Sequence, residues 1–171
     1  MKGYIQIYTG NGKGKTTAAL GLALRAAGAG KKVFFAQFVK GQIYSEVKAL
    51  RQFIPSVEVR QYGLKCFIRN EPTQADMEAA REGFIEVSEI IISGDYDIVV
   101  LDEANIAIFY GLFSADELIG VFRQKPCKTE IIITGRYVAP ELIEIADLVT
   151  EMQEIKHYYQ KGVEARVGIE C

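Results

Sequence analysis

The sequence predicts an α/β fold in which a mostly parallel β-sheet is covered by helices on both faces. Three observations lead to this prediction. Six short segments rich in β-branched and aromatic residues alternate with segments of helical periodicity. The central strand-like segments are almost continuously apolar, as expected of strands that are buried on both faces. Strand–helix alternation also favours right-handed crossovers, which make neighbouring strands parallel.

The strand predictions rest on short apolar runs. The run at residues 98–101, IVVL, is typical of a buried strand. It is far shorter than the ~18 residues of a membrane span, so no membrane association is expected. The predicted strands are Tyr4–Tyr8, Lys32–Phe38, Val57–Tyr62, Asp97–Leu101, Glu130–Thr134 and Leu148–Met152.

Helical patterns lie between these strands. The segment Thr17–Ala27 is rich in Ala and Leu, and Thr73–Ile92 repeats apolar residues at steps of three and four. Thr73 and Ser114 are each followed three residues later by an acidic residue, which is the spacing of a capping box. Pro140 stands where the first turn of a helix accepts proline. Helices are therefore predicted to start at these three positions.

Length and composition favour one domain spanning residues 1–171. The 20 basic and 22 acidic side chains give a net charge of −2, which argues against a nucleic-acid binder or a polybasic membrane surface. The cysteines (Cys66, Cys127 and Cys171) are odd in number and lack a CxxC spacing, so reduced thiols in a cytoplasmic protein are expected. No signal peptide is expected, because a strand-like segment begins at Tyr4.

Residues 9–17, TGNGKGKTT, have the features of a phosphate-binding loop (P-loop) between a strand and a helix. Three glycines let backbone N–H groups form a concave anion site, to which the helix adds its positive end. Lys15 would supply charge to phosphate oxygens, and the Thr16 hydroxyl is placed for Mg²⁺. Thr9 replaces the first glycine of the usual pattern. The predicted nucleotide-binding residues are Gly10, Asn11, Gly12, Lys13, Gly14, Lys15, Thr16 and Thr17.

Two acidic residues complete the predicted site. Asp102 and Glu103 follow the apolar run at 98–101, and ligands of such sheets bind outside the carboxyl ends of the strands. One of the two acids would hold Mg²⁺, directly or through water. The structural alternatives are a glycine-rich turn without ligand and an Asp that caps a helix beginning at Ala104. Because the two motifs occur together, a site for a nucleotide and Mg²⁺ is the favoured interpretation.

The P-loop resembles that of the P-loop corrinoid adenosyltransferases, including the threonine at position 9. Further similar segments follow in order: QFVKG at 37–41, LDE at 101–103, IITGR at 132–136 and EIAD at 144–147. The end of the chain, from Ile155 through Gly162 to Glu170, also looks like the end of that family. The resemblance spans nearly the whole chain.

This resemblance implies a RecA-like fold and an enzyme that transfers the 5′-deoxyadenosyl group of ATP to the cobalt of a reduced corrinoid, releasing triphosphate. Co(I) would be the nucleophile, so the protein would position the substrates and would need no catalytic side chain. By the same resemblance the triphosphate lies reversed in the P-loop, and Thr16 and Glu103 belong to the Mg²⁺ site with Asp102 close by. A homodimer and a reductant such as a flavodoxin or a flavin are further expectations.

Two features depart from the family pattern. Members carry an aromatic pair in a Gly-Phe-Thr-Trp segment after the third strand, whereas residues 63–67 here read GLKCF, with Leu64 and Cys66 at the aromatic positions. Phe67 is the remaining candidate to face the corrinoid. Core packing of Phe67, or a role for Tyr62 in its place, are the alternatives. No counterpart of the N-terminal extension that often precedes the first strand in that family is expected here, which leaves open what covers ATP.

Two roles are open for most of the other residues of interest. Arg136 would contact phosphate or a corrinoid side chain, or else form a surface ion pair. Lys13 would be a second phosphate contact or a solvated side chain. His157, the only histidine, is interpreted as a hydrogen-bonding residue rather than a metal ligand. Tyr158 and Tyr159 are interpreted as packing residues, with lining of a flat macrocycle site as the alternative.

Two other function classes stay open on the sequence. One is a P-loop ATPase or small-molecule kinase, in which Glu103 polarises a water or an acceptor hydroxyl. The other is a nucleotide-sensing module without chemistry. No Arg-rich lid is evident in the sequence, which disfavours a kinase, and the similarity of the chain's end to the family disfavours a sensor.

Overall fold

The protein is described from a computed structural model that covers residues 2–64 and 71–170. Its centre is a six-stranded sheet in the order β3-β2-β4-β5-β1-β6, and all five strand pairings are parallel. The predicted parallel sheet is confirmed, and each predicted strand matches an observed one to within one residue at either end. The strands are β1 (Ile5–Thr9), β2 (Val33–Phe38), β3 (Val57–Tyr62), β4 (Ile98–Asp102), β5 (Glu130–Thr134) and β6 (Leu148–Glu151).

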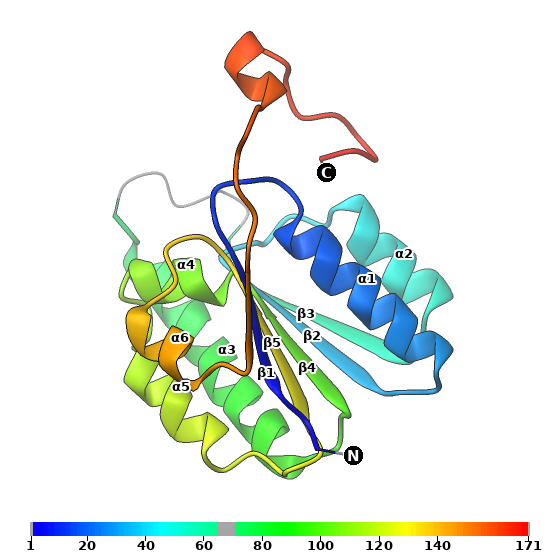
Figure 1. Cartoon of the computed structure of the whole chain (residues 1–171), viewed down its shortest axis with the longest axis vertical. Coiled ribbons are helices and arrows are strands. Elements are labelled where there is room, and N and C mark those ends of the chain that lie inside the picture. The colour runs from blue at the N-terminus through cyan, green and yellow to red at the C-terminus, as the bar shows by residue number, and fades with distance from the viewer. Residues whose placement is uncertain (1, 65–70, 171) are drawn as a thin grey trace.

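Helices cover both faces of this sheet (Figure 1). On one face, α1 and α2 pack their apolar residues on β2, β3, β4 and β5. On the other face, α3, α4, α5 and α6 enclose a second and larger core. The prediction that helices cover both faces of the sheet is thus confirmed. The helices are α1 (Lys15–Gly28), α2 (Ser45–Phe53), α3 (Gln74–Ser93), α4 (Ala104–Phe109), α5 (Ala115–Phe122), α6 (Pro140–Ile145) and the short 3₁₀ helix η1 (Tyr158–Lys161).

The local signals in the sequence explain where three of the helices begin. Thr73 and Ser114 both form complete capping boxes, and Pro140 occupies the first turn of α6. All residues of β2 and β4 are buried, as their apolar runs predict. No helix was predicted from the sequence at the position of α2. From the sequence, the boundary at Ala104 was only an alternative to the metal site, yet α4 does begin at that residue.

The carboxyl ends of the strands meet at one edge of the sheet, and the backbone is strained there. Among the described residues, three non-glycine residues have positive φ: Val39 (50°), Glu103 (60°) and Tyr137 (58°). They follow β2, β4 and β5, which are three neighbouring strands. Non-glycine residues in this conformation cluster at ligand sites, because function can offset the local cost. This edge is therefore where a site is expected.

Candidate functional site

The P-loop leads from β1 into α1 at this edge. Lys15, the first residue of α1, is 8 % exposed, and its Nζ donates to the carbonyl oxygens of Gly10 and Gly12, both at 2.8 Å. Burial lowers the pKa of Lys15 below its usual value. An ammonium has three N–H donors. Two of them hold the P-loop in shape, so one is left for an anion that enters the loop.

Asp102, the last residue of β4, is fully buried beneath the P-loop. Its Oδ1 accepts from the hydroxyls of Thr16 (2.8 Å) and Thr134 (2.7 Å). Its Oδ2 accepts from Lys40 Nζ (2.9 Å) and Gln37 Nε2 (3.2 Å). A carboxylate offers about four lone-pair positions, so these four donors satisfy it. Burial is the largest influence and would raise the pKa of Asp102, but the charge of Lys40 and the hydrogen bonds from Lys40, Thr134 and Thr16 together lower it.

Lys40 follows β2 and brings a positive charge among the oxygen atoms of the site. Its side chain is 11 % exposed, and its Nζ lies 2.9 Å from Asp102 Oδ2 and 3.6 Å from Glu103 Oε1. The same Nζ donates to Thr16 Oγ1 at 3.2 Å. Burial alone would lower the pKa of Lys40, but the two carboxylates raise it well above its usual value. These oxygens therefore already accommodate a cation.

Glu103 turns out of the sheet toward open space. Its φ of 60° lets α4 begin directly after β4, and its backbone N–H donates to Thr134 Oγ1 at 3.0 Å. The Thr134 hydroxyl donates in turn to Asp102, so one side chain on β5 fixes both acids. Burial raises the pKa of Glu103. Its side chain is 21 % exposed, whereas that of Asp102 is inaccessible, so only Glu103 of the two acids can be reached from outside.

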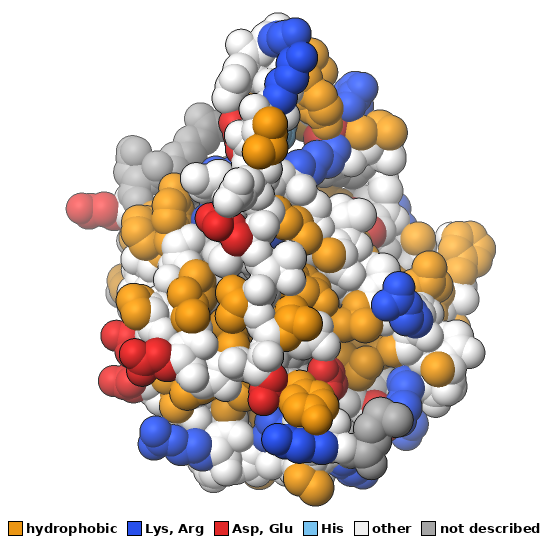
Figure 2. Space-filling view, in the orientation of Figure 1, with side chains coloured by type: hydrophobic (Ala, Val, Ile, Leu, Met, Phe, Trp, Pro, Cys, Tyr) orange, Lys and Arg blue, Asp and Glu red, His pale blue; other side chains and the backbone are white. Residues whose placement is uncertain are grey.

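The tail, residues 152–170, lies over the P-loop. Met152 N donates to Thr9 O at 2.9 Å, and Gly12 N donates to Met152 O at 2.6 Å. A Cβ at position 12 would lie 2.7 Å from Met152 O, which explains glycine there. Lys13 Nζ donates to Glu170 Oε1 at 2.7 Å and to the Tyr158 hydroxyl at 2.9 Å. Figures 1 and 2 show the tail projecting beyond the sheet and returning toward α1, with hydrophobic side chains along it.

Two neighbouring cavities open at this edge. The P-loop cavity, of about 520 Å³, is bounded by the P-loop, the start of α2 and the tail. The second cavity, of about 450 Å³, extends toward α4 and the loop after β5. Lys15, Glu103 and Arg136 line both of them. A molecule in one cavity would therefore be adjacent to a molecule in the other.

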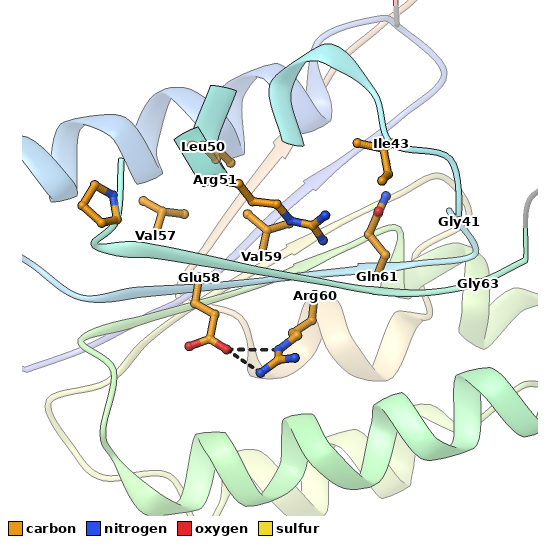
Figure 3. Close-up of a pocket in the computed structure, with 11 residues that line it drawn as sticks. Gly41, Ile43, Leu50, Arg51, Val57, Glu58, Val59, Arg60, Gln61 and Gly63 are labelled. Atoms are coloured by element: carbon orange, nitrogen blue, oxygen red, sulfur yellow. Dashed lines mark hydrogen bonds and ion pairs between the residues drawn. The ribbon is translucent and has the colours of Figure 1, made fainter. Parts of the chain in front are cut away.

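A larger hollow, of about 730 Å³, lies elsewhere, between α2 and the edge strand β3 (Figure 3). Its lining includes Gln61 and the ion pair of Arg60 with Glu58, but no P-loop residue. Gln61 Nε2 donates to Gln37 Oε1 at 3.0 Å, so it braces the hydrogen bonds around Asp102 from this side. This hollow therefore lacks the anion site that the P-loop cavity contains.

Most predicted site residues converge, and three further residues join them. Arg136 is exposed and reaches both cavities, and it forms no ion pair within the described residues. Phe67 lies outside the described residues. The sequence reading assigned no site role to Lys40, Gln37 or Thr134. Their signal was their position just before or after the carboxyl end of a predicted strand, within segments already noted as similar to the family.

The predictions for the tail side chains have different outcomes. His157 caps η1, because its Nδ1 accepts from Tyr159 N at 3.1 Å, and this confirms the hydrogen-bonding interpretation. Lys13 forms an ion pair with Glu170, so its side chain is not simply surrounded by solvent. The hydrogen bond to Glu170 raises the pKa of Lys13. Tyr158 packs against its neighbours, with the Lys13 ammonium 5.6 Å from its ring centre. Tyr159, at 75 % exposed, is not a packing residue in this chain, which corrects that expectation.

Comparisons with known proteins agree along the whole chain. The model of the family described as "ATP:corrinoid adenosyltransferase BtuR/CobO/CobP" matches residues 1–171. A corrinoid adenosyltransferase of Pseudomonas aeruginosa is 34 % identical, over 99 % of this chain and 84 % of the relative. A corrinoid adenosyltransferase of Escherichia coli K12 and corrinoid adenosyltransferase CobA of Salmonella typhimurium are each 35 % identical, over 99 % of this chain and 86 % of the relative.

A comparison of folds gives a more distant similarity. The crystal structure of the flagellar accessory protein FlaH from Methanocaldococcus jannaschii matches with a TM-score of 0.61 at 14 % identity. The match covers 88 % of this chain and 71 % of that protein, and it concerns the fold alone. Separately, within residues 2–64 and 71–170 no helix has the length and apolar character needed to span a membrane.

Proposed function

This chain belongs to the ATP:corrinoid adenosyltransferase family, and we propose that it releases the whole triphosphate when it transfers the adenosyl group. In the proposed step the electron pair of Co(I) attacks C5′ of ATP. The C5′–O5′ bond breaks, its electrons leave with triphosphate, and the cobalt becomes formally Co(III). Because cobalt is the nucleophile, the protein contributes by positioning two substrates and by stabilising the departing charge.

The observation that carries this proposal is the pair of cavities joined at Lys15, Glu103 and Arg136. A P-loop cavity that holds triphosphate has the cation of Lys15 facing the leaving group. The second cavity opens directly beside it, which is where a second substrate has to approach C5′. A hydrolytic ATPase needs room only for water at this point, so a cavity of about 450 Å³ favours a large acceptor.

The oxygen atoms around Lys40 support a Mg²⁺ site. The ammonium lies within 3.6 Å of oxygens from Thr16, Asp102 and Glu103, and hydroxyl and carboxylate oxygens are the ligands that Mg²⁺ prefers. We propose that Thr16 and Glu103 would hold the ion, while Asp102, already satisfied by four donors, orients Thr16. When bound, Mg²⁺ would neutralise charge on the triphosphate.

Glu103→Gln keeps the shape of the side chain and removes its negative charge. If Glu103 holds Mg²⁺, we expect the Mg²⁺ concentration for half-maximal activity to rise by about tenfold or more, because a charged ligand is lost. Titration of activity with Mg²⁺ measures this, and circular dichroism checks the fold. Glu89→Gln, an exposed acid on α3, should leave the titration unchanged. A Glu103→Gln titration equal to that of the parent would remove Glu103 from the metal site.

The proposed reaction is tested by its products. Under anaerobic conditions with ATP, Mg²⁺ and chemically reduced cobalamin, we expect the absorption spectrum of an alkyl–cobalt corrinoid, which light should abolish by breaking the Co–C bond. Lys15→Ala serves as the control with an impaired P-loop. Formation of ADP without the alkyl–cobalt spectrum would show phosphoryl transfer instead, and binding of ATP without any product would show a sensor.

The remaining expectations about the assembly and its surroundings belong to the same proposal. We propose a single domain that acts as a homodimer in the cytoplasm and receives electrons for Co(I) from a reduced flavin or a flavodoxin. Exposed apolar side chains on the tail support the dimer, since Ile155 is 88 % and Val167 is 86 % exposed. Sedimentation equilibrium of the purified protein measures the mass, and a monomer at micromolar concentration would contradict the homodimer.

A further inference from the structure

Two exposed aromatic rings contact each other beside the second cavity. Phe109 ends α4, and Tyr137 lies in the loop after β5. Their ring centroids are 4.4 Å apart, and the planes are inclined by 30°. Phe109 is 57 % exposed and Tyr137 is 54 % exposed. We call these two residues the aromatic pair. Single exposed apolar residues are ordinary, but a contiguous apolar patch beside a cavity points to a ligand.

The backbone of Tyr137 gives a second reason to assign a function to the pair. Its φ of 58° is in the left-handed region, which a bulky side chain adopts only with strain and glycine adopts freely. Glycine at this position would relieve the strain, yet the chain has a tyrosine whose ring is more than half exposed. Such strain is characteristic of positions at which a side chain is presented to a ligand.

The pair is continuous with the site described above. Tyr137 and Tyr110 both line the second cavity, together with the apolar side chains of Val39 and Ile106. The Phe109 ring packs edge-on against Tyr110, with centroids 5.5 Å apart, so Phe109 contacts two aromatic residues that line the cavity. Because the P-loop cavity takes ATP, the molecule that meets this surface is the second substrate.

We propose that the aromatic pair is a platform that packs against the corrin macrocycle and holds it at the mouth of the second cavity, facing ATP. This inference rests on the function proposed above. A corrinoid presents a broad, largely apolar ring with amide groups around its rim. Exposed aromatic rings suit contact with the macrocycle, and Arg136 in the same cavity can donate to an amide oxygen. Phe109 and Tyr137 would thus be positioning residues for the corrinoid.

The test measures corrinoid binding separately from ATP binding. Cobalamin in the Co(II) state is the probe, its dissociation constant is measured by equilibrium dialysis, and that of ATP by calorimetry. For the double variant Phe109→Ala/Tyr137→Gly we expect the cobalamin dissociation constant to rise about tenfold, since two aromatic contacts are lost. The ATP dissociation constant should stay within about twofold of the parent value, because the P-loop is unchanged.

Three controls separate this role from a structural one. The thermal midpoint of Tyr137→Gly should stay close to that of the parent, because the backbone strain that is relieved offsets the lost ring contact with Phe109. Phe109→Trp keeps an aromatic ring at this position, so its dissociation constant for cobalamin should be close to that of the parent. Phe53→Ala removes an aromatic that is 70 % exposed at the end of α2, away from both cavities, and should change neither constant.

Two results would overturn the inference: an unchanged cobalamin dissociation constant in the double variant, or weaker ATP binding with cobalamin binding intact. The second result would mean that the aromatic pair contacts the nucleoside of ATP rather than the corrinoid. Failure of the proposed function is recognised separately. A parent protein that binds cobalamin but fails to adenosylate it would contradict the reaction, whereas the comparison of parent and variant binding would still decide the role of the pair.

Discussion

Lys40→Met should destabilise the protein by about 3–5 kcal/mol, the usual cost of removing one partner from a buried ion pair. The Lys40 side chain is 11 % exposed, and its ammonium lies 2.9 Å from the inaccessible carboxylate of Asp102. Without Lys40, Asp102 would keep a negative charge in a buried position with only neutral donors around it. Unfolding in urea, followed by circular dichroism, measures the change in the free energy of unfolding.

Lys31→Met is the matched control for this prediction. Lys31 pairs with Asp97 at 3.2 Å, but the two side chains are 46 % and 36 % exposed. Such an exposed pair contributes about 0–1 kcal/mol. The double variant Lys40→Met/Asp102→Asn removes the unpaired charge and should recover part of the lost stability. Equal effects of Lys40→Met and Lys31→Met would contradict the buried pairing of Lys40 with Asp102.

Lys15→Ala should weaken ATP binding about ten- to a hundredfold, because a charge-assisted hydrogen bond to phosphate contributes roughly 1.5–3 kcal/mol. Lys15 also holds the carbonyl oxygens of Gly10 and Gly12, both at 2.8 Å, so its loss loosens the P-loop itself. Both effects act on ATP in the same direction. Calorimetric titration of the purified variant with ATP measures the dissociation constant.

Lys31→Ala provides the comparison for ATP binding, since it removes a lysine that lines neither the P-loop cavity nor the second cavity. Its dissociation constant for ATP should equal that of the parent. The thermal midpoint of Lys15→Ala shows whether the fold is retained. A folded Lys15→Ala variant with parental affinity would mean that the triphosphate does not lie in the P-loop.

The fold follows from the sequence because its signals are local. A buried parallel strand needs an apolar run, and a capping box marks a helix start, so β4 and α3 can be recognised from a few neighbouring residues. α2 is harder to recognise. Its N-cap residue, Tyr44, provides no side-chain cap, and only Val47 and Leu50 among its nine residues are buried. Such a helix is stabilised by packing on the sheet rather than by a local pattern.

The residues of the site also fall into those that the sequence identifies and those that only the structure brings together. The P-loop and the two acids have fixed spacing, so the sequence identifies them. Lys40 and Thr134 both form hydrogen bonds with Asp102, from which they are separated by 62 and 32 residues along the chain. No local sequence pattern encodes such contacts. The contact of the tail with Lys13 spans 157 residues to Glu170. The left-handed backbone of Tyr137 also depends on its neighbours in space, which is why the aromatic pair emerges only from the structure.

The most direct test of the proposed reaction follows the two ends of ATP separately. ATP labelled with ¹⁴C in the adenosyl group and with ³²P in the γ-phosphate is incubated with the protein, Mg²⁺ and cob(I)alamin, and the products are separated by chromatography. We predict ¹⁴C in the corrinoid and ³²P in triphosphate, in equal amounts. Recovery of ¹⁴C in ADP and ³²P in inorganic phosphate, with none of the ¹⁴C bound to cobalt, would contradict adenosyl transfer.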